Sequence, residues 1–172
     1  MASSRSGERG SAIIEFAFAG VTVIILLLVI FEMCLAMWSY HTLALAVKTG
    51  AIYVSTKGQD CYTGYNCGVT VSDIVNRVLH AGVGLDASRL NLTFHSSDPK
   101  STDITCDPAS SCKSNGTSWP PSGGYVPNID YIEISASYPA PMPIMSLFWP
   151  GQSLGGLGDV EFSASSRQVI QF

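Results

Sequence analysis

The sequence of 172 residues predicts an α+β fold, in which a long N-terminal transmembrane helix packs on a small antiparallel sheet of about three strands, with long disulfide-tied loops. Three observations predict this fold: a nearly uncharged apolar run over residues 11–38, three later segments in which apolar and polar residues alternate, and four cysteines in polar segments beyond the run. We expect residues 1–10 to form a cytoplasmic leader and residues 11–55 the long helix, spanning the membrane to about residue 38. Residues 56–172 would then form an extracytoplasmic domain.

The apolar run contains only two charged residues, Glu15 and Glu32. A spanning helix needs about 20 mostly apolar residues, which this run supplies. An ordinary secretory signal peptide is the first alternative, but it has a shorter apolar core and a small-residue cleavage site soon after it. Here the nearest such site, at residues 44–46, comes well after the core, so the sequence favours a retained anchor.

The charges around the run predict its orientation. Arg5 and Arg9 precede it with a single acid, Glu8, so the positive-inside rule keeps the N-terminus in the cytoplasm. Trp38 and Tyr40 lie where an aromatic belt would mark the outer interface. The remainder of the chain is therefore expected outside the membrane.

The helix is expected to continue past the membrane, because no helix breaker follows Trp38 until after residue 55. Gly50 weakens this part by about 1 kcal/mol relative to alanine. A helix over residues 11–55 would be about 65 Å long. Its outer half carries one apolar stripe at helical spacing, formed by Leu43, Ala46, Val47, Ala51 and Val54.

The extracytoplasmic segment reads as one short helix followed by strands. Residues 69–85 predict a helix with Ser72 as N-cap and Gly82 or Gly84 at its end. Apolar and polar residues alternate over residues 88–97, 128–139 and 158–172, which is typical of strands with one buried face. Their apolar positions are Leu90, Leu92 and Phe94; Ile132, Ile134 and Ala136; and Val160, Phe162 and Ala164. We expect helix to cover this face.

Two connections separate the expected strands. Residues 96–128 are rich in Ser, Pro, Gly and Asp and predict a long surface loop. Residues 139–158 are unusually apolar for a loop. They are interpreted either as a helical turn folded back on the edge of the sheet or as an exposed patch that meets another subunit or the membrane.

Four cysteines lie in the two polar loops and predict disulfides in an oxidising compartment. Cys61 and Cys67 share one loop, and Cys106 and Cys112 share another with the same spacing. The equal spacing favours pairing within each loop, although four cysteines allow three connectivities. Neither pair has the Cys-x₂-Cys spacing of a zinc knuckle, so a zinc site has weaker support.

Composition excludes several classes of function. Charged residues make up 13% of the chain and the net charge is −4, so no nucleic-acid partner is expected. His41, His80 and His95 are scattered, which gives no metal site. No nucleophile elbow or phosphate-binding loop is found. We expect neither an enzyme nor a cofactor.

Glu15 raises a separate question, because a carboxylate in hydrocarbon costs about 2.5–3.5 kcal/mol at the helix centre. A tolerated interfacial glutamate is one interpretation. Cleavage after Gly10 offers another, since it would remove Arg5 and Arg9 and make Ser11 the new N-terminus. The carboxylate of one subunit could then pair with the ammonium of its neighbour and set their axial register.

The short basic head, Gly10, four residues, Glu15 and then Phe16 opening an apolar helix together resemble the type IV prepilin signal. More closely, "GSAIIEFAFAGVTVIILLLVIFEMCLAMWSYHTLALAVKTGAIYVST" resembles the N-terminal region of TadE-like minor pseudopilins of the tight-adherence (Flp-type) pilus. In that family a second glutamate follows toward the outer end of the helix, as Glu32 does here. An arginine often ends the alanine-rich stretch, where this chain has Lys48.

The resemblance implies cleavage between Gly10 and Ser11 by a prepilin peptidase, and roles in assembly or recognition for Glu15, Phe16 and Glu32. It also implies a structural protein of the bacterial inner membrane, whose partners are other pilins or pseudopilins and the Tad assembly platform, in a pilus or a related secretion machine. The alternative is a single-span membrane-anchored binding module, whose extracytoplasmic domain captures a ligand.

Overall fold

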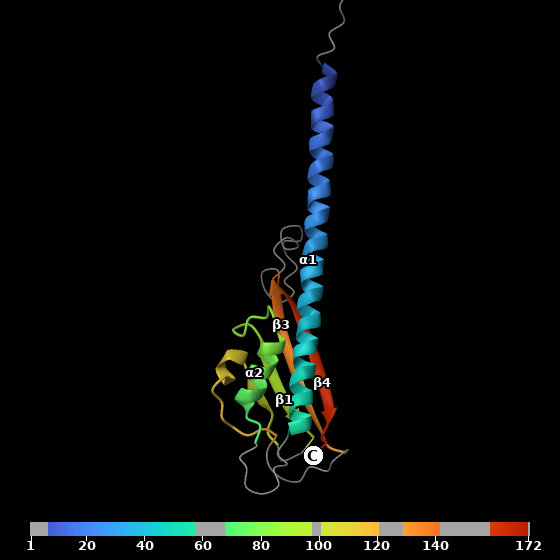
Figure 1. Ribbon diagram of the computed structural model, residues 1–172. Helices are drawn as coiled ribbons and strands as arrows, with labels where there is room; N and C mark the ends of the chain where they lie inside the picture. Colours follow the sequence, from blue (N-terminus) through green and yellow to red (C-terminus); the bar gives the residue numbers. More distant parts are fainter. Residues whose placement is uncertain (1–6, 58–67, 98–100, 121–128, 142–158, 172) are drawn as a thin grey trace, which may run out of the picture.

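The computed structural model describes residues 7–57, 68–97, 101–120, 129–141 and 159–171. Its elements are the helices α1 (Gly7–Lys57) and α2 (Val71–Ala81), the 3₁₀ helix η1 (Ala109–Cys112), and the strands β1 (Asn91–Ser96), β2 (Ile104–Cys106), β3 (Tyr131–Pro141) and β4 (Asp159–Val169). Figure 1 shows α1 as one long rod, with the domain attached to its C-terminal half. The predicted α+β fold is confirmed.

The sheet has four antiparallel strands in the order β2-β1-β3-β4. The three predicted strands correspond to β1, β3 and β4. The fourth, β2, lies within residues 96–128, so the prediction of one long loop there was wrong in part. Only three residues form β2, too few to show an alternation, and they are held by pairing with β1, with Leu92 opposite Cys106.

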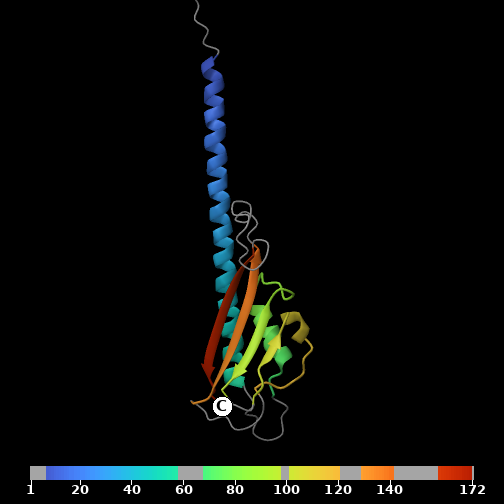
Figure 2. The same cartoon turned by 180° about the vertical axis from the view of Figure 1, so that it is seen from behind.

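The apolar face of the sheet is the one predicted from the alternation. Leu92 and Phe94 on β1 and Ile132 and Ile134 on β3 are fully buried, and Phe162 on β4 packs against them. Figure 2 shows the sheet from behind, with α1 on its far side. The predicted stripe on α1 is buried in the same core, through Leu43, Ala46, Val47, Ala51 and Val54.

Helix α2 begins with Thr70 as N-cap, and the prediction of Ser72 was wrong. The Asp73 backbone N–H donates to the Thr70 hydroxyl at 3.2 Å, and the Thr70 backbone N–H donates to the Asp73 carboxylate at 3.1 Å. This reciprocal capping box satisfies two backbone donors that the helix leaves free. The backbone N–H of Gly82, one of the two predicted ends, donates to the Val78 carbonyl at 2.8 Å and closes the helix.

Gly50 lies where α1 packs closely against α2 and β3. A Cβ atom at Gly50 would lie 2.6 Å from Val78 Cγ2, 3.6 Å from Ile134 Cδ1 and 3.8 Å from Ile74 Cγ2. In the sequence this glycine counted only as a weak point of the helix. In the structure its missing side chain permits the close packing of three elements.

The apolar connection after the second predicted strand begins later than expected, because β3 extends through Pro141. Pro139 pairs with Glu161 and Ala140 with Val160, whereas the pairing of β3 with β1 ends at Ser137. The prolines therefore lie where β3 has one paired neighbour, as their missing N–H requires. Residues 142–158 lie outside the described residues, and both interpretations of that segment stay predictions.

We expect Gly50→Ala to lower the free energy of unfolding by about 1 kcal/mol. Overpacking costs about 1–3 kcal/mol, and alanine returns up to about 1 kcal/mol of helix propensity. Val78 is β-branched and buried, so it has little freedom to move aside. Thermal or chemical denaturation of the full chain in detergent measures the change.

The double variant Gly50→Ala, Val78→Ala is the control for this prediction. With the valine methyl groups removed, Gly50→Ala should be neutral or stabilising relative to Val78→Ala alone. An equal loss in both backgrounds would contradict close approach as the reason for the glycine.

Candidate functional site

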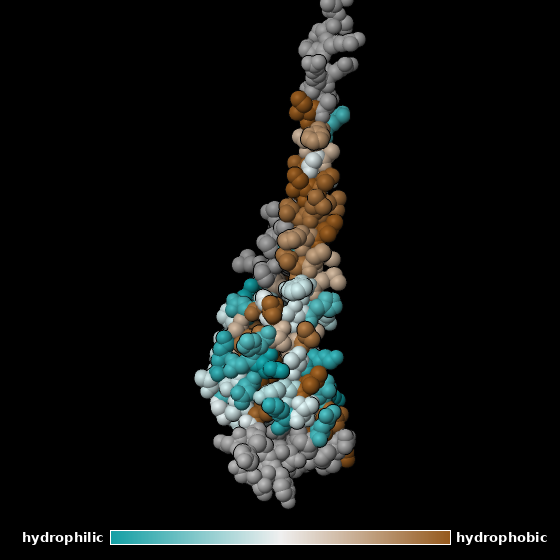
Figure 3. All heavy atoms as spheres, in the orientation of Figure 1, coloured by the Kyte–Doolittle hydropathy of each residue, from teal (hydrophilic) through white to brown (hydrophobic). Residues whose placement is uncertain are grey.

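The N-terminal half of α1 exposes a continuous apolar surface. Large side chains from Ile13 to Trp38 are mostly exposed, and Phe16 is the most exposed, at 79%. Figure 3 shows this surface as a mainly hydrophobic column above the mixed surface of the domain. Among the described residues, α1 provides a helix long and apolar enough to cross a membrane. A surface of this kind needs lipid or other helices around it.

The predicted processing and assembly residues lie at the start of this column. The backbone of Gly10 and Ser11 lies within α1, which begins at Gly7. Glu15 and Phe16 follow about one turn later, and both side chains are exposed. Within the described part of the chain, Glu15 has no hydrogen bond or ion pair. Its carboxylate is therefore available to a group outside this subunit.

Glu32 lies in a different environment, with only 8% of its surface exposed. It belongs to a side of α1 on which intermediate burial recurs every three or four residues, at Ile25, Val29, Ala36 and Ser39. The same spacing of three or four residues continues toward the C-terminus to Leu43, the first residue of the buried stripe. Glu32 thus lies on the side of the helix that carries the domain.

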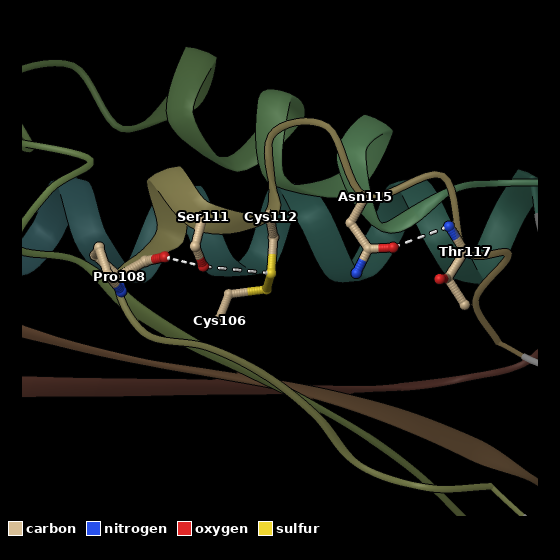
Figure 4. Close-up of a disulfide and its surroundings, with 6 residues drawn as sticks. All are labelled: Cys106, Pro108, Ser111, Cys112, Asn115 and Thr117. Carbon is tan, nitrogen blue, oxygen red and sulfur yellow. Dashed lines mark hydrogen bonds between the residues drawn. A yellow bond between two sulfur atoms is a disulfide. The ribbon is translucent and has the colours of Figure 1, made fainter.

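A disulfide joins Cys106, the last residue of β2, to Cys112, the last residue of η1, with their Cα atoms 5.8 Å apart. The prediction of this pairing is confirmed. Figure 4 shows the Ser111 hydroxyl donating to the Pro108 carbonyl at 2.7 Å beside the sulfur atoms. Both cysteines are buried. Cys61 and Cys67 lie outside the described residues, so their pairing stays a prediction.

A row of charged side chains crosses the exposed face of the sheet, and it was not predicted from the sequence. His95 on β1 lies opposite Glu133 on β3, which lies opposite Arg167 on β4. His95 Nδ1 is 2.7 Å from Asp103 Oδ1, and Arg167 Nε donates to Glu133 at 3.3 Å. The Arg167 guanidinium also stacks 3.7 Å from the centre of the Tyr131 ring. Strand register assembles this row, and no local pattern contains it.

Exposed ion pairs of this kind stabilise a fold by about 0–1 kcal/mol each. The row therefore defines a solvated face of the sheet, opposite α1. The described residues contain no group of three or more His, Cys, Asp or Glu side chains that could hold a metal ion. Nothing in the row has the geometry of a nucleophile activated by a base.

The turn after α2 contains one carboxyl group with a perturbed pKa. The backbone N–H of Ser88 and then its hydroxyl, at 2.9 and 2.8 Å, donate to Asp86 and hold its pKa below the usual range. Arg89 and Lys113 add a weaker electrostatic effect in the same direction. The charged form of Asp86 thus orders the turn that leads into β1.

We expect Cys106→Ala, Cys112→Ala to lower the free energy of unfolding by about 2 kcal/mol, near the low end of the usual range because the closed loop is short. Denaturation of the detergent-solubilised full chain measures the loss. Cys34→Ala is the matched control, because Cys34 is a free cysteine on the exposed half of α1. Equal stability of the double variant and this control would show that the disulfide does not support the domain.

Comparison with known proteins finds a similarity over most of the long helix. Residues 10–51 match the family model described as TadE-like protein. The matched segment covers most of α1, with Gly10, Ser11, Glu15, Phe16 and Glu32, and ends before α2 and the sheet. No curated protein and no solved structure matches the chain at the significance required. The resemblance of the N-terminal region to TadE-like proteins is therefore confirmed over residues 10–51.

Proposed function

We propose that the chain is a pilin-like structural subunit, a minor pseudopilin, which serves in the assembly of a Tad (Flp-type) pilus or a related secretion machine. One observation carries the proposal: a single helix exposes a long apolar surface over its N-terminal half and closes the core of the domain with its C-terminal half. Such a subunit can be stored in a membrane and then packed by the same helix into an assembly. The TadE-like match over this helix supports that function.

In this proposal the chain is anchored once in the bacterial inner membrane, with residues 1–10 in the cytoplasm. The helix over residues 11–55 crosses the membrane to about residue 38, and residues 56–172 form the extracytoplasmic domain. The buried disulfide between Cys106 and Cys112 supports this placement, because disulfides persist in oxidising compartments. The role is structural and not enzymatic.

A prepilin peptidase would cut between Gly10 and Ser11, and the new ammonium group of Ser11 would pair with Glu15 of a neighbouring subunit. The exposed Glu15 side chain supports this step. In low dielectric an unpaired carboxylate is costly, so the pair favours one axial register over slipped ones. The partners are the peptidase, other pilins or pseudopilins and the assembly platform, with Phe16 and Glu32 as further recognition residues.

The mature protein is expected to begin at Ser11. Intact-mass measurement of the protein purified from cells that contain the peptidase should show loss of residues 1–10. The same chain from peptidase-deficient cells is the control and should keep them. A mature protein from peptidase-positive cells that retains the bond between Gly10 and Ser11 would remove the processed-subunit interpretation.

Glu15→Gln should leave membrane insertion intact and reduce the amount of assembled pili by at least about tenfold, the factor that corresponds to 1.4 kcal/mol. Membrane fractionation and counts of surface pili separate the two effects. Glu161→Gln, at an exposed position of β4, is the matched control and should assemble normally.

Unchanged piliation by Glu15→Gln would eliminate the proposed charge pair. Replacing residues 13–38 with an unrelated apolar span provides a second arm. Full function of that chimera would favour the membrane-anchored binding module, because such a module needs the helix only as an anchor.

A further inference from the structure

The extracytoplasmic half of α1 carries a second stripe on the side away from the buried stripe. At its N-terminal end the indole nitrogen of Trp38 lies near the domain, 4.0 Å from where a Cβ atom at Gly84 would be. The positions of this second stripe alternate in steps of four and three, and its members are Trp38, Thr42, Leu45, Thr49, Ile52 and Thr56. The three large side chains are exposed, at 64% for Trp38, 58% for Leu45 and 42% for Ile52. With 3.6 residues per turn, Leu45 points about 160° away from the buried Leu43. We call these six residues the outer stripe.

The threonines of the outer stripe are less polar than their residue type implies. Thr42, Thr49 and Thr56 each donate the side-chain hydroxyl to the carbonyl four residues earlier, at 2.8 Å in all three cases. With the donor used inside the helix, each side chain can turn its methyl group outward. The outer stripe therefore has an apolar character along its whole length, although half of its members are threonines.

Steps of four and three define the seam of a two-stranded coiled coil. In such a seam, β-branched residues at one position and large apolar residues at the other favour two parallel helices. The outer stripe has this composition, with threonine at one position and Trp38, Leu45 or Ile52 at the other. It contains no charged residue, and the core of the domain packs on the other side of α1.

We propose that the outer stripe is the contact surface of a parallel, in-register dimer of this chain outside the membrane. Two copies anchored by the same apolar span enter the same bilayer in the same direction and at the same depth. Each residue of the outer stripe then meets its own equivalent.

Membrane anchoring makes this short seam sufficient. About three heptads are marginal for two chains free in water, but confinement to one bilayer raises their effective concentration. The dimer goes beyond the proposed function, because it needs neither cleavage after Gly10 nor a pilus. It also differs from a staggered arrangement of subunits in a fibre, in which non-equivalent residues would meet.

Disulfide cross-linking of the full chain in membranes tests the proposal. In a Cys34→Ser background, Leu45→Cys or Ile52→Cys should give cross-linked dimers at least about tenfold faster than Asn76→Cys, because anchored equivalents are held close together. Asn76 is the control, since it is exposed on α2 and away from the outer stripe. The background without an added cysteine gives the baseline.

Register is tested by mixing two distinguishable chains, one with Leu45→Cys and one with Ile52→Cys. These positions are one heptad apart, about 10 Å along the helix, which is too far for a disulfide between in-register helices. We expect dimers of each chain with itself and none between the two. Cross-links between the two chains would overturn the in-register dimer and indicate a staggered packing.

A third variant separates dimerisation from folding. Leu45→Glu, Ile52→Glu places like charges in the seam and should reduce cross-linking at an added Thr49→Cys to the baseline. Because both replaced side chains are exposed, the thermal midpoint should stay unchanged. Cross-linking that is equal at Leu45→Cys and Asn76→Cys, or that joins the chain only to other proteins, would overturn the proposal. Neither outcome affects the mass and piliation tests of the proposed function.

Discussion

The structure depends on the packing of the C-terminal half of α1 against the apolar face of the sheet. This face is the core side of β1, β3 and β4, and α1 covers it with a stripe of fully buried residues. Gly50 allows a close approach of α1 to α2, because any side chain there would meet Val78. The domain therefore cannot separate from its membrane anchor without exposing its own core.

This packing connects the anchor and the domain through one continuous helix. The helix α1 is continuous from Gly7 to Lys57, so the depth at which Glu15 is held also determines the height of the domain above the membrane. A slip of one helical turn would displace the domain by about 5.4 Å. The proposed charge pair at Glu15 and the proposed dimer contact along the outer stripe would therefore both help to determine the axial position of the subunit.

Local patterns in the sequence predicted most of the elements, because periodicity reports burial directly. Both the long helix and the alternation in β1, β3 and β4 were readable in this way. Features that depend on distant partners were not. Three residues of β2 become a strand only through pairing with β1, and Gly50 acquires its role only through its proximity to Val78.

The charged row on the sheet shows the same limit, since the register of three strands aligns its members. The outer stripe was obscured for another reason. Its threonines read as polar until their hydroxyl groups are seen to be bonded within the helix. The two acids of the apolar run are also distinguished only in the structure. Glu15 is exposed near the N-terminal end of α1, whereas Glu32 is buried on the side that carries the domain. Because a carboxylate is costly to bury without a compensating polar interaction, Glu32 depends on the fold of its own chain, whereas the exposed Glu15 is the acid that the proposed pairing with a neighbour requires.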